Sequence, residues 1–378
     1  MIPPTRVTVL GGGSGAFAVA ADLQLKGCQV RLLEAPELEA NIAPAQKKGG
    51  IELVNTNVSG VASGFAHLEM VTTSPKEALR GADVVLYVVP AFAEKHFTEL
   101  CAHHFARGQL VVLFCGNFGG ALELAHLMRL RGGLSLPLIA ETEGLIYGAS
   151  KLDSTTVKVV GLKDGVACAA LPARETGKVL SRLRTLFPAL LPATNVLETS
   201  FRNLNPVIHP PVSVLNAGRT AEDRPQWRYY WEGVTEPVGR VTERVDRERL
   251  GTAMAFGLRL PPAREVLRSW YVREALRGTT LAELLSSNPV YEGVLAPRTL
   301  THRFLLEDVP FGLVPVEALA LSVNVATPII TALIDLSSEL LNRDFRAEGR
   351  DLIRLGLIGL EAKEVKQLLD GGGCPSGS

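Results

Sequence analysis

The chain has 378 residues, of which 47% are hydrophobic and 21% charged, and its 39 basic and 39 acidic residues give a formal net charge of zero. This length exceeds what one core ordinarily holds, so we expect two domains, and the balanced charge does not indicate a nucleic-acid surface. No segment approaches the roughly 18 uninterrupted apolar residues of a membrane span, and no signal-peptide pattern opens the chain. We expect a cytoplasmic protein that binds neither nucleic acid nor a membrane.

The cysteines are scattered through the chain and never form a C-x-x-C pair. Such a set is typical of small core residues in a reducing compartment, and it indicates neither a disulfide framework nor a zinc site. We therefore expect no bound metal. The five cysteines are Cys28, Cys101, Cys115, Cys168 and Cys374.

In the first half of the chain, short apolar runs typical of buried strands alternate with stretches of helical spacing. Strands that alternate with helices predict a parallel, doubly wound sheet. The expected strands are 7–10, 29–33, 83–89, 110–114 and 138–140, and the expected helices are 14–26, 91–106 and 120–131.

The segment 155–170 breaks this alternation, because two strand-like runs, 156–161 and 165–170, follow each other directly. We interpret them as a hairpin that adds an antiparallel edge to the sheet. A helix over 175–187, followed by two prolines, then predicts a domain boundary near residue 192.

The second half is predicted to be helical and is punctuated by proline-containing turns. The expected helices are 238–250, 262–277, 281–286, 316–341 and 351–355. The sequence thus predicts an α/β domain over 1–191, an all-α domain over 192–370, and a disordered glycine- and serine-rich tail over 371–378.

The first expected strand runs directly into the glycine-rich segment 11–16, which reads G-x-G-x-x-A. In this motif Gly11 makes the tight turn, Gly13 lets the backbone approach a pyrophosphate, and Ala16 lets the helix pack on the strand. The N–H groups at the helix start then bind the phosphates. The motif predicts a Rossmann-type dinucleotide-binding domain, and the alternative is a glycine-rich turn without a cofactor.

Glu34 ends the second expected strand, where a carboxylate accepts from the ribose 2′-hydroxyl and repels a 2′-phosphate. No Arg or Lys follows it immediately, so we predict NAD, with NADH preferred over NADPH. Pro90 ends the third strand and is expected to shape the pocket rim, with simple strand termination as the alternative. The predicted cofactor contacts are Gly11, Gly13, Ser14, Gly15, Ala16, Glu34 and Pro90.

A second glycine-rich turn, 115–120, follows the fourth expected strand. Ligands of doubly wound sheets bind beyond the carboxyl ends of the strands. Asn117 is therefore a candidate to donate to a substrate carboxylate or to the nicotinamide side of the cofactor. The alternative is a plain strand-to-helix connection.

His209 stands out among the seven histidines because of its setting, the segment 203–211, which holds two asparagines and three prolines just past the expected boundary. We interpret this segment as a rigid, hydrogen-bonded turn and expect His209 to face the cleft between the domains. Hydride transfer to a C=O or C=N bond needs a proton donor, and histidine suits that role near neutral pH.

Several separated segments resemble the opine (octopine/nopaline) dehydrogenases, most closely the bacterial N-(1-carboxyethyl)-amino-acid dehydrogenases. The resemblance spans roughly residues 5–360 and departs from the family at Ala16, where glycine is frequent. It implies that His209 is the catalytic histidine, Asp308 its aspartate partner and Arg303 a substrate-binding residue. Besides the glycine-rich turn, it rests on 88–91, 119–123, 205–210, 229–235, 288–289 and 304–315.

The resemblance implies an enzyme that joins the amine of an amino acid to a 2-keto acid, by default pyruvate, and reduces the imine with NADH. Histidine would polarise the carbonyl and transfer protons, aspartate would hold the imidazole tautomer, and arginine would clamp a carboxylate. Asn205 and Tyr230 are further candidates for substrate contacts. The aromatic cluster at 227–231 favours a hydrophobic amino acid if it lines the pocket, and the alternative is that these rings belong to the core. The apolar stretch 329–341 is buried either in its own domain or in a homodimer.

Two alternatives stay open. Enzymes that resemble ketopantoate reductase or glycerol-phosphate dehydrogenase would reduce a C=O bond, but they typically use a lysine in the second half, where the nearest lysines here are Lys363 and Lys366. A dinucleotide-binding regulator without chemistry would be expected to lack a complete set of His, Asp and Arg.

Overall fold

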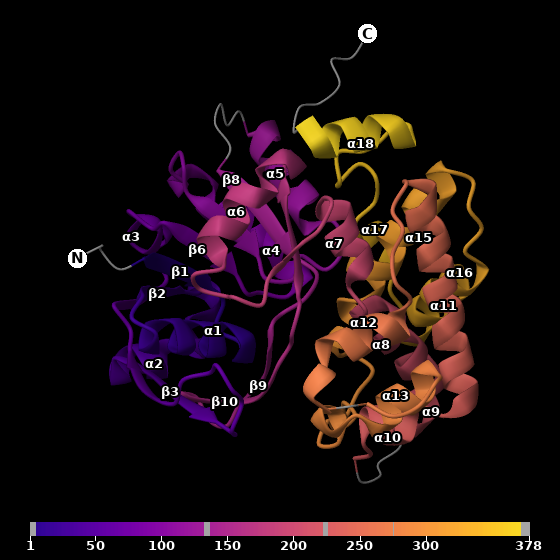
Figure 1. Ribbon diagram of the computed structural model, residues 1–378, viewed down its shortest axis with the longest axis horizontal. Helices are drawn as coiled ribbons and strands as arrows, with labels where there is room; N and C mark the ends of the chain where they lie inside the picture. Colours follow the sequence, from indigo (N-terminus) through magenta and orange to yellow (C-terminus); the bar gives the residue numbers. More distant parts are fainter. Residues whose placement is uncertain (1–4, 132–136, 222–225, 275, 372–378) are drawn as a thin grey trace. The chain divides into compact units, whose positions relative to one another are not determined.

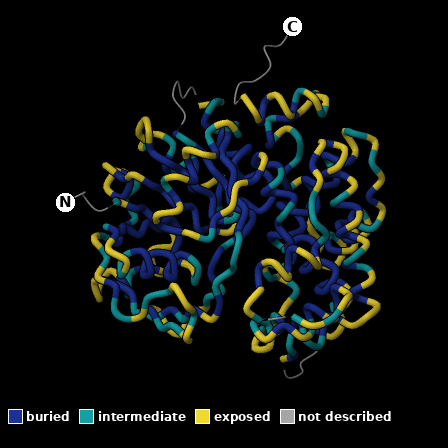
Figure 2. Tube along the Cα trace, viewed as in Figure 1, coloured by how far each residue is buried: buried dark blue, intermediate teal, exposed yellow. Residues whose placement is uncertain are grey.

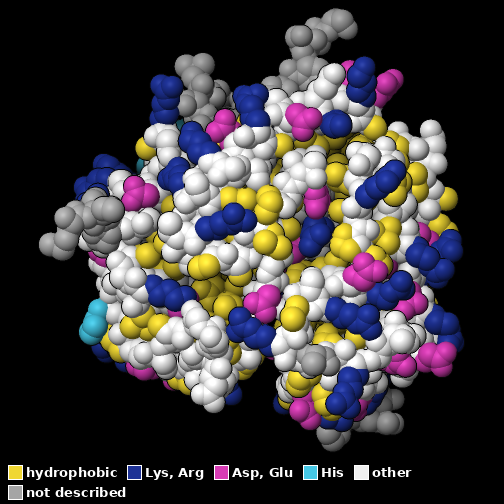
Figure 3. Space-filling model, in the orientation of Figure 1, with side chains coloured by type: hydrophobic (Ala, Val, Ile, Leu, Met, Phe, Trp, Pro, Cys, Tyr) yellow, Lys and Arg dark blue, Asp and Glu magenta, His cyan; other side chains and the backbone are white. Residues whose placement is uncertain are grey.

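The computed structural model describes residues 5–131, 137–221, 226–274 and 276–371, and these form two compact units. Unit 1 comprises the described residues of 1–116 and 120–196, and unit 2 comprises 117–119 together with those of 197–378. The predicted boundary near residue 192 lies just before this division. On the face that Figure 3 shows, acidic and basic side chains are interspersed.

Unit 1 is built on an eight-stranded sheet with the strand order β12-β11-β8-β7-β6-β1-β2-β5. All neighbouring pairs are parallel except β8 and β11, which run antiparallel. The central strands are buried on both faces (Figure 2), which explains their continuous apolar runs. The strands are β1 Arg6–Leu10, β2 Gln29–Leu33, β5 Met70–Thr72, β6 Val84–Tyr87, β7 Leu110–Leu113, β8 Leu138–Thr142, β11 Ala167–Leu171 and β12 Leu191–Pro192.

The helices of unit 1 confirm the predicted alternation of strands and helices (Figure 1). They are α1 Ser14–Leu25, α2 Ala43–Lys48, α3 Pro75–Leu79, α4 Ala91–Cys101, α5 Gly120–Leu130 and α6 Thr176–Leu183, with 3-10 turns at Pro36–Asn41, Ala102–His104 and Ala173–Glu175.

A second, four-stranded sheet with the order β4-β3-β10-β9 also belongs to unit 1. Its strands are β3 Gly50–Asn55, β4 Gly64–His67, β9 Tyr147–Lys151 and β10 Thr156–Leu162. Helix α1 packs against both sheets, and its residues from Ala16 to Leu23 are all buried. Because α1 is covered on every side, its sequence is apolar all round rather than amphipathic.

The hairpin expected within 155–170 is wrong. The first run is β10, which pairs with β9 in the second sheet, and the second run is β11, which pairs antiparallel with β8 in the main sheet. The real turn lies between β9 and β10, where the Asp153 carboxylate accepts from the Thr155 N–H at 2.7 Å. Strand β9 was missed because Gly148, Ala149 and Ser150 have little strand propensity.

Unit 2 is all-α in its described residues, as predicted. Among the described residues, no helix combines the length and the apolar character needed to cross a bilayer. The helices are α7 Val196–Arg202, α8 Asn205–Leu215, α9 Ala217–Ala221, α10 Tyr229–Gly233, α11 Glu236–Ala255, α12 Ala263–Trp270, α13 Leu281–Ser287, α14 Arg303–Leu306, α15 Val314–Ser322, α16 Pro328–Leu341, α17 Phe345–Glu348 and α18 Ala362–Gly371, with a π turn at Val309–Leu313 and 3-10 turns at Val272–Glu274 and Pro289–Tyr291.

The segment around His209 is the N-terminal part of helix α8 rather than a rigid turn. Pro210 and Pro211 lie inside this helix and remove two backbone donors, which ordinarily breaks a helix. The helix persists because every residue from Pro206 to Val214 is buried, so that tertiary packing stabilises it.

Three further helix predictions need correction. The stretch 316–341 is two helices, α15 and α16, separated where Asn324 adopts a left-handed conformation (φ 57°) and Pro328 begins the next helix. The stretch 351–355 is a single hydrogen-bonded turn ended by Gly356 at φ 68°, and 262–277 shortens to α12 and a 3-10 turn. In the expected tail, Gly371 ends α18, and 372–378 lie outside the described residues.

Candidate active site

The glycine-rich turn after β1 has the backbone geometry that the motif requires. Gly11 adopts φ 109°, and a Cβ there would lie 2.7 Å from the Val88 carbonyl oxygen, so only glycine fits. Gly13 precedes α1, and apart from Gly13 itself and its two neighbours in the chain, no described atom lies within 4 Å of where its Cβ would be. The first N–H groups of α1 have no partner within the helix. This open, donor-rich surface fits a pyrophosphate.

Glu34 follows β2 and lies directly beside this turn. A Cβ on Gly12 would approach its Oε2 to 2.6 Å. The buried carboxylate accepts from the backbone N–H of Ala35 at 2.9 Å and from Nδ2 of Asn41 at 3.1 Å. Because an ionised carboxylate only accepts, this site suits a ribose hydroxyl and disfavours a phosphate.

Lys151 of the second sheet lies at the same edge and was not identified from the sequence. Its backbone N–H donates to Oγ of Ser14 at 3.1 Å, and its Nζ lies 3.5 Å from the centroid of the Phe17 ring. Burial lowers the pKa of Lys151, and the charge of Glu34 acts in the opposite direction. No motif marks this lysine, because only the sheet pairing brings β9 to the start of α1.

Pro90 is exposed at the start of α4, just after Val88 and Val89, which border Gly11. Its predicted contribution to the pocket rim stays a prediction. Ser14 and Gly15 open α1, and Ala16 is fully buried, as close helix packing requires.

The second glycine-rich turn contributes to unit 2. The Phe118 N–H donates to the Phe311 carbonyl at 3.0 Å, and the Gly119 N–H donates to Oγ of Ser200 at 3.0 Å. Asn117, at φ 50°, is buried, and its Nδ2 donates to Oδ1 of Asp308 at 3.1 Å. Its amide is thus engaged with the protein, and the predicted substrate contact stays a prediction.

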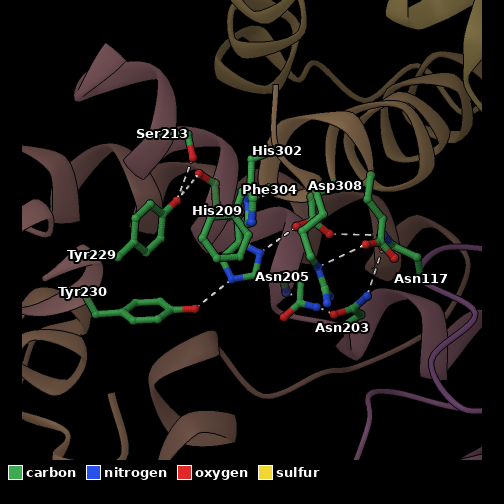
Figure 4. A network of polar contacts seen from close by, with 12 residues as sticks. Asn117, Asn203, Asn205, His209, Ser213, Tyr229, Tyr230, His302, Phe304 and Asp308 are labelled. Carbon is green, nitrogen blue, oxygen red and sulfur yellow. Dashed lines mark hydrogen bonds and ion pairs between the residues drawn. The ribbon is translucent and has the colours of Figure 1, made fainter. Parts of the chain in front are cut away.

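His209 and Asp308 form a buried pair in unit 2, with Nδ1 of the histidine 2.6 Å from Oδ2 of the aspartate (Figure 4). Asp308 is fully buried and precedes the π turn. Because an ionised carboxylate can only accept, the Nδ1 atom carries the proton and Nε2 of a neutral His209 is an acceptor. The Nε2 atom lies 2.8 Å from the Tyr230 hydroxyl, which donates to it.

Aromatic rings fix the His209 imidazole (Figure 4). Phe304 stacks on it, with centroids 4.1 Å apart and an interplanar angle of 29°. The Tyr229 hydroxyl donates to the His209 carbonyl at 2.9 Å and lies 2.7 Å from Oγ of Ser213. Burial raises the pKa of the Tyr230 phenol and of the Tyr229 phenol, so both stay protonated donors.

Arg303 and Asn205 lie on the elements that carry this pair. Arg303 begins α14, its side chain is 54% exposed, and its Nε lies 3.3 Å from Oε2 of Glu307. Asn205 begins α8 one helical turn before His209, so both residues lie on the same face. Their substrate contacts stay predictions.

Sequence reasoning missed two residues around the pair, Asn203 and His302. Asn203 donates through Nδ2 to Oδ1 of Asn117 at 3.0 Å, and His302 accepts from the Phe304 N–H at the start of α14. Burial and the charge of Arg303 lower the pKa of His302 to about 4. Among the residues that the structure describes, no group of three or more His, Cys, Asp or Glu side chains is placed to hold a metal ion.

Comparison with known proteins relates the chain to the octopine/nopaline dehydrogenases. The model of the family described as NAD/NADP octopine/nopaline dehydrogenase, alpha-helical domain, matches residues 192–341. An opine dehydrogenase of Arthrobacter sp. (strain 1C) is 36% identical over 371 residues, which cover 98% of this chain and 100% of the relative. Protein ocs of Agrobacterium tumefaciens (strain Ach5) is 27% identical and covers 97% of this chain and 99% of its own length.

The fold agrees with solved structures of the same kind. An octopine dehydrogenase structure with NADH and L-arginine superposes with a TM-score of 0.78 at 20% identity, covering 97% of this chain and 98% of the other. The family resemblance and the fold class expected from the sequence are therefore confirmed.

Proposed function

The chain belongs to the opine dehydrogenase family, and from that membership and its site geometry we propose that it joins an amino acid to a 2-keto acid, with pyruvate as the keto acid. The product is a secondary-amine dicarboxylate, and the reaction is reversible. The observation that carries this proposal is the buried His209–Asp308 pair, in which Nδ1 and Oδ2 are 2.6 Å apart. Such a pair is the proton-transfer device that a reductive condensation needs.

The balance of the reaction assigns the protons. The substrate amine forms a C–N bond to the keto carbon and passes one of its N–H protons to the carbonyl oxygen, which takes a second proton from His209 and leaves as water. The resulting iminium carbon takes up a hydride, which a nicotinamide held at the glycine-rich turn would supply. His209 in its imidazolium form donates from Nε2 to the departing oxygen, and Asp308 stabilises the imidazolium through Nδ1. In the reverse direction neutral His209 takes the proton back.

Tyr230 binds Nε2 of His209 in the free enzyme at 2.8 Å, which is where the substrate oxygen would engage. Burial raises the pKa of the Tyr230 phenol, so a phenolate is disfavoured and the hydroxyl is a poor proton source. Tyr230 therefore holds the imidazole until the substrate oxygen takes its place.

Arg303 is the proposed partner of a substrate carboxylate, because its guanidinium is half exposed and begins the helix next to Asp308. A planar guanidinium binds a carboxylate through two parallel hydrogen bonds. Asn205, on the face of α8 that carries His209, is a second proposed substrate contact.

The amine partner is proposed to be a hydrophobic amino acid. Further aromatic rings pack beside Tyr230, because Tyr230 stacks on Tyr291 at 4.3 Å and Tyr271 contacts Tyr291 edge to face at 5.5 Å. An apolar side chain gains from burial against such rings.

Glu34 is the basis for proposing NADH over NADPH. Its carboxylate is buried beside the glycine-rich turn, so a 2′-phosphate would meet a like charge there. The cytoplasmic location expected from the sequence belongs to the same proposal, whereas the sequence left open whether the chain forms a homodimer. Helix α16 buries Ile330, Leu333 and Ile334 within its own unit, and light scattering of the purified protein would test the dimer.

The test is NADH oxidation by the purified protein with pyruvate and a panel of amino acids, with pyruvate alone and amine alone as controls. Oxidation that requires both partners supports reductive condensation, and the best amine identifies the substrate. Oxidation with pyruvate alone would favour a simple C=O reductase. No turnover with any pair, together with measurable NADH binding, would favour a dinucleotide-binding regulator.

A further inference from the structure

A chain of hydrogen bonds extends behind the catalytic pair (Figure 4). Oδ1 of Asp308 accepts from Nδ2 of Asn117 at 3.1 Å, and Oδ1 of Asn117 accepts from Nδ2 of Asn203 at 3.0 Å. Oδ1 of Asn203 accepts from the backbone N–H of Asn205 at 3.0 Å. Asn117, Asn203 and Asp308 are all buried.

Both ends of this chain have fixed polarity. The Asn205 backbone N–H can only donate, and the Asp308 carboxylate, when ionised, can only accept. Each amide between them must therefore point its oxygen toward Asn205 and its NH₂ group toward Asp308. Reversing one amide would oppose two oxygens or two donors in a buried place, which is costly.

The hydrogen-bond network also begins and ends on one helix, α8. Asn205 and His209 are both in α8, one turn apart, so the network starts and ends on the same element. Asp308 thus receives Asn117 on Oδ1 and His209 on Oδ2. With each oxygen held by a donor, the carboxylate cannot rotate away from the imidazole.

We propose that Asn117 and Asn203 are positioning residues that hold the Asp308 carboxylate, through one polarised amide chain, in the orientation that keeps the proton on Nδ1 of His209. The proposal rests on the function proposed above and adds two residues that act through Asp308. Asn117 is thereby assigned a role that differs from direct substrate binding.

Exchange of asparagine for aspartate tests the polarity without changing the volume. Asn117→Asp and Asn203→Asp each offer one donor to the chain when protonated and none when ionised. At about pH 9 we expect kcat for reductive condensation to fall roughly ten- to hundred-fold in both variants, the loss expected for a hydrogen bond to a charged group. The deficit should shrink as the pH falls, because a protonated aspartate restores the donor.

Thr252→Ala is the matched control, because it removes a buried hydrogen bond within α11, from the Thr252 hydroxyl to the Glu248 carbonyl, that lies outside both the amide chain and the surroundings of His209. We expect this variant to lose stability toward denaturant while its kcat stays within about threefold of wild type at every pH. The proposal is overturned if the two aspartate variants keep wild-type kcat at about pH 9, or if the control shows the same pH-dependent deficit.

A second readout does not depend on turnover. In protein labelled with ¹⁵N-histidine, and with the His209 signals assigned by a His209→Gln variant, the ¹⁵N shifts report which ring nitrogen carries the proton. Asn117→Asp at about pH 9 should move the proton of neutral His209 from Nδ1 toward Nε2. A moved proton without opine turnover would sink the proposed function and leave the amide chain standing. Turnover with an unmoved proton and unmoved kcat would refute the amide chain alone.

Discussion

Replacing Asp308 by asparagine is the perturbation that tests the site most directly. The side chain keeps its size, and Oδ1 of the new asparagine can still accept from Asn117. Its NH₂ group would then face Nδ1 of His209, 2.6 Å away in the wild type. The imidazole must respond by moving its proton to Nε2, so that Nε2 no longer accepts and the imidazolium loses its counter-ion.

The magnitude follows from the charge pair. Unit charges about 4 Å apart attract by about 4 kcal/mol at an effective dielectric constant of about 20. Asp308 is fully buried, so solvent screens this attraction little. Because about 1.4 kcal/mol corresponds to tenfold, we expect Asp308→Asn to lower kcat about a thousand-fold.

The assay is steady-state NADH oxidation with pyruvate and the best amine, supported by NADH binding and by denaturant unfolding of each variant. The double variant Asp308→Asn/His209→Gln should have a kcat no lower than that of the less active single variant, because the two residues act as one unit. A loss of less than about tenfold in folded Asp308→Asn, or losses that multiply in the double variant, would refute this account of the pair.

Three further outcomes are expected. Glu34→Gln should weaken NADH binding and raise the NADPH/NADH ratio of kcat/KM by about tenfold or more, and an unchanged ratio would remove Glu34 from cofactor selection. Tyr230→Phe should change KM while kcat stays within about tenfold, because the hydroxyl yields to the substrate oxygen; a loss of about a hundred-fold in kcat would instead put Tyr230 on the proton path. The pKa of His302 is lowered to about 4 from 6.5 by burial and by nearby charge, so the unfolded chain binds its proton first and stability is lost as pH falls from about 6.5 to about 4. His302→Asn keeps a helix cap and should make the acid-induced loss of unfolding free energy smaller by at most about 3 kcal/mol, an upper limit that solvent screening lowers. If the unfolding free energies of the two proteins fell in parallel as the pH is lowered, the lowered pKa of His302 would be contradicted.

Part of the local structure could be predicted from the sequence, because the patterns that indicate it lie within a few neighbouring residues. The apolar runs of β1, β2, β6 and β7 predicted buried parallel strands, and the glycine spacing after β1 predicted the tight turn. Local patterns misled where tertiary packing overrides them. Pro210 and Pro211 predicted a turn, yet burial keeps them in α8.

Long-range pairing was the main source of error in the fold. The two strand-like runs of 155–170 were correctly identified as extended, but propensity does not say which sheet a strand joins. Strand β10 pairs with the weakly patterned β9 in the second sheet, and β11 pairs with β8 in the main sheet. The position of Lys151 beside the start of α1 follows from the same pairing and was not predictable.

By itself, the sequence determined that a dinucleotide motif precedes a helical half, and family resemblance identified His209, Asp308 and Arg303 as candidates. The tertiary structure alone decided that His209 and Asp308, 99 positions apart, are in contact, and that Asn117 and Asn203 hold the carboxylate from behind. The physical reason is that a hydrogen bond acts over about 3 Å, whereas a sequence pattern extends only along the chain, so residues from distant segments meet only after the helices pack.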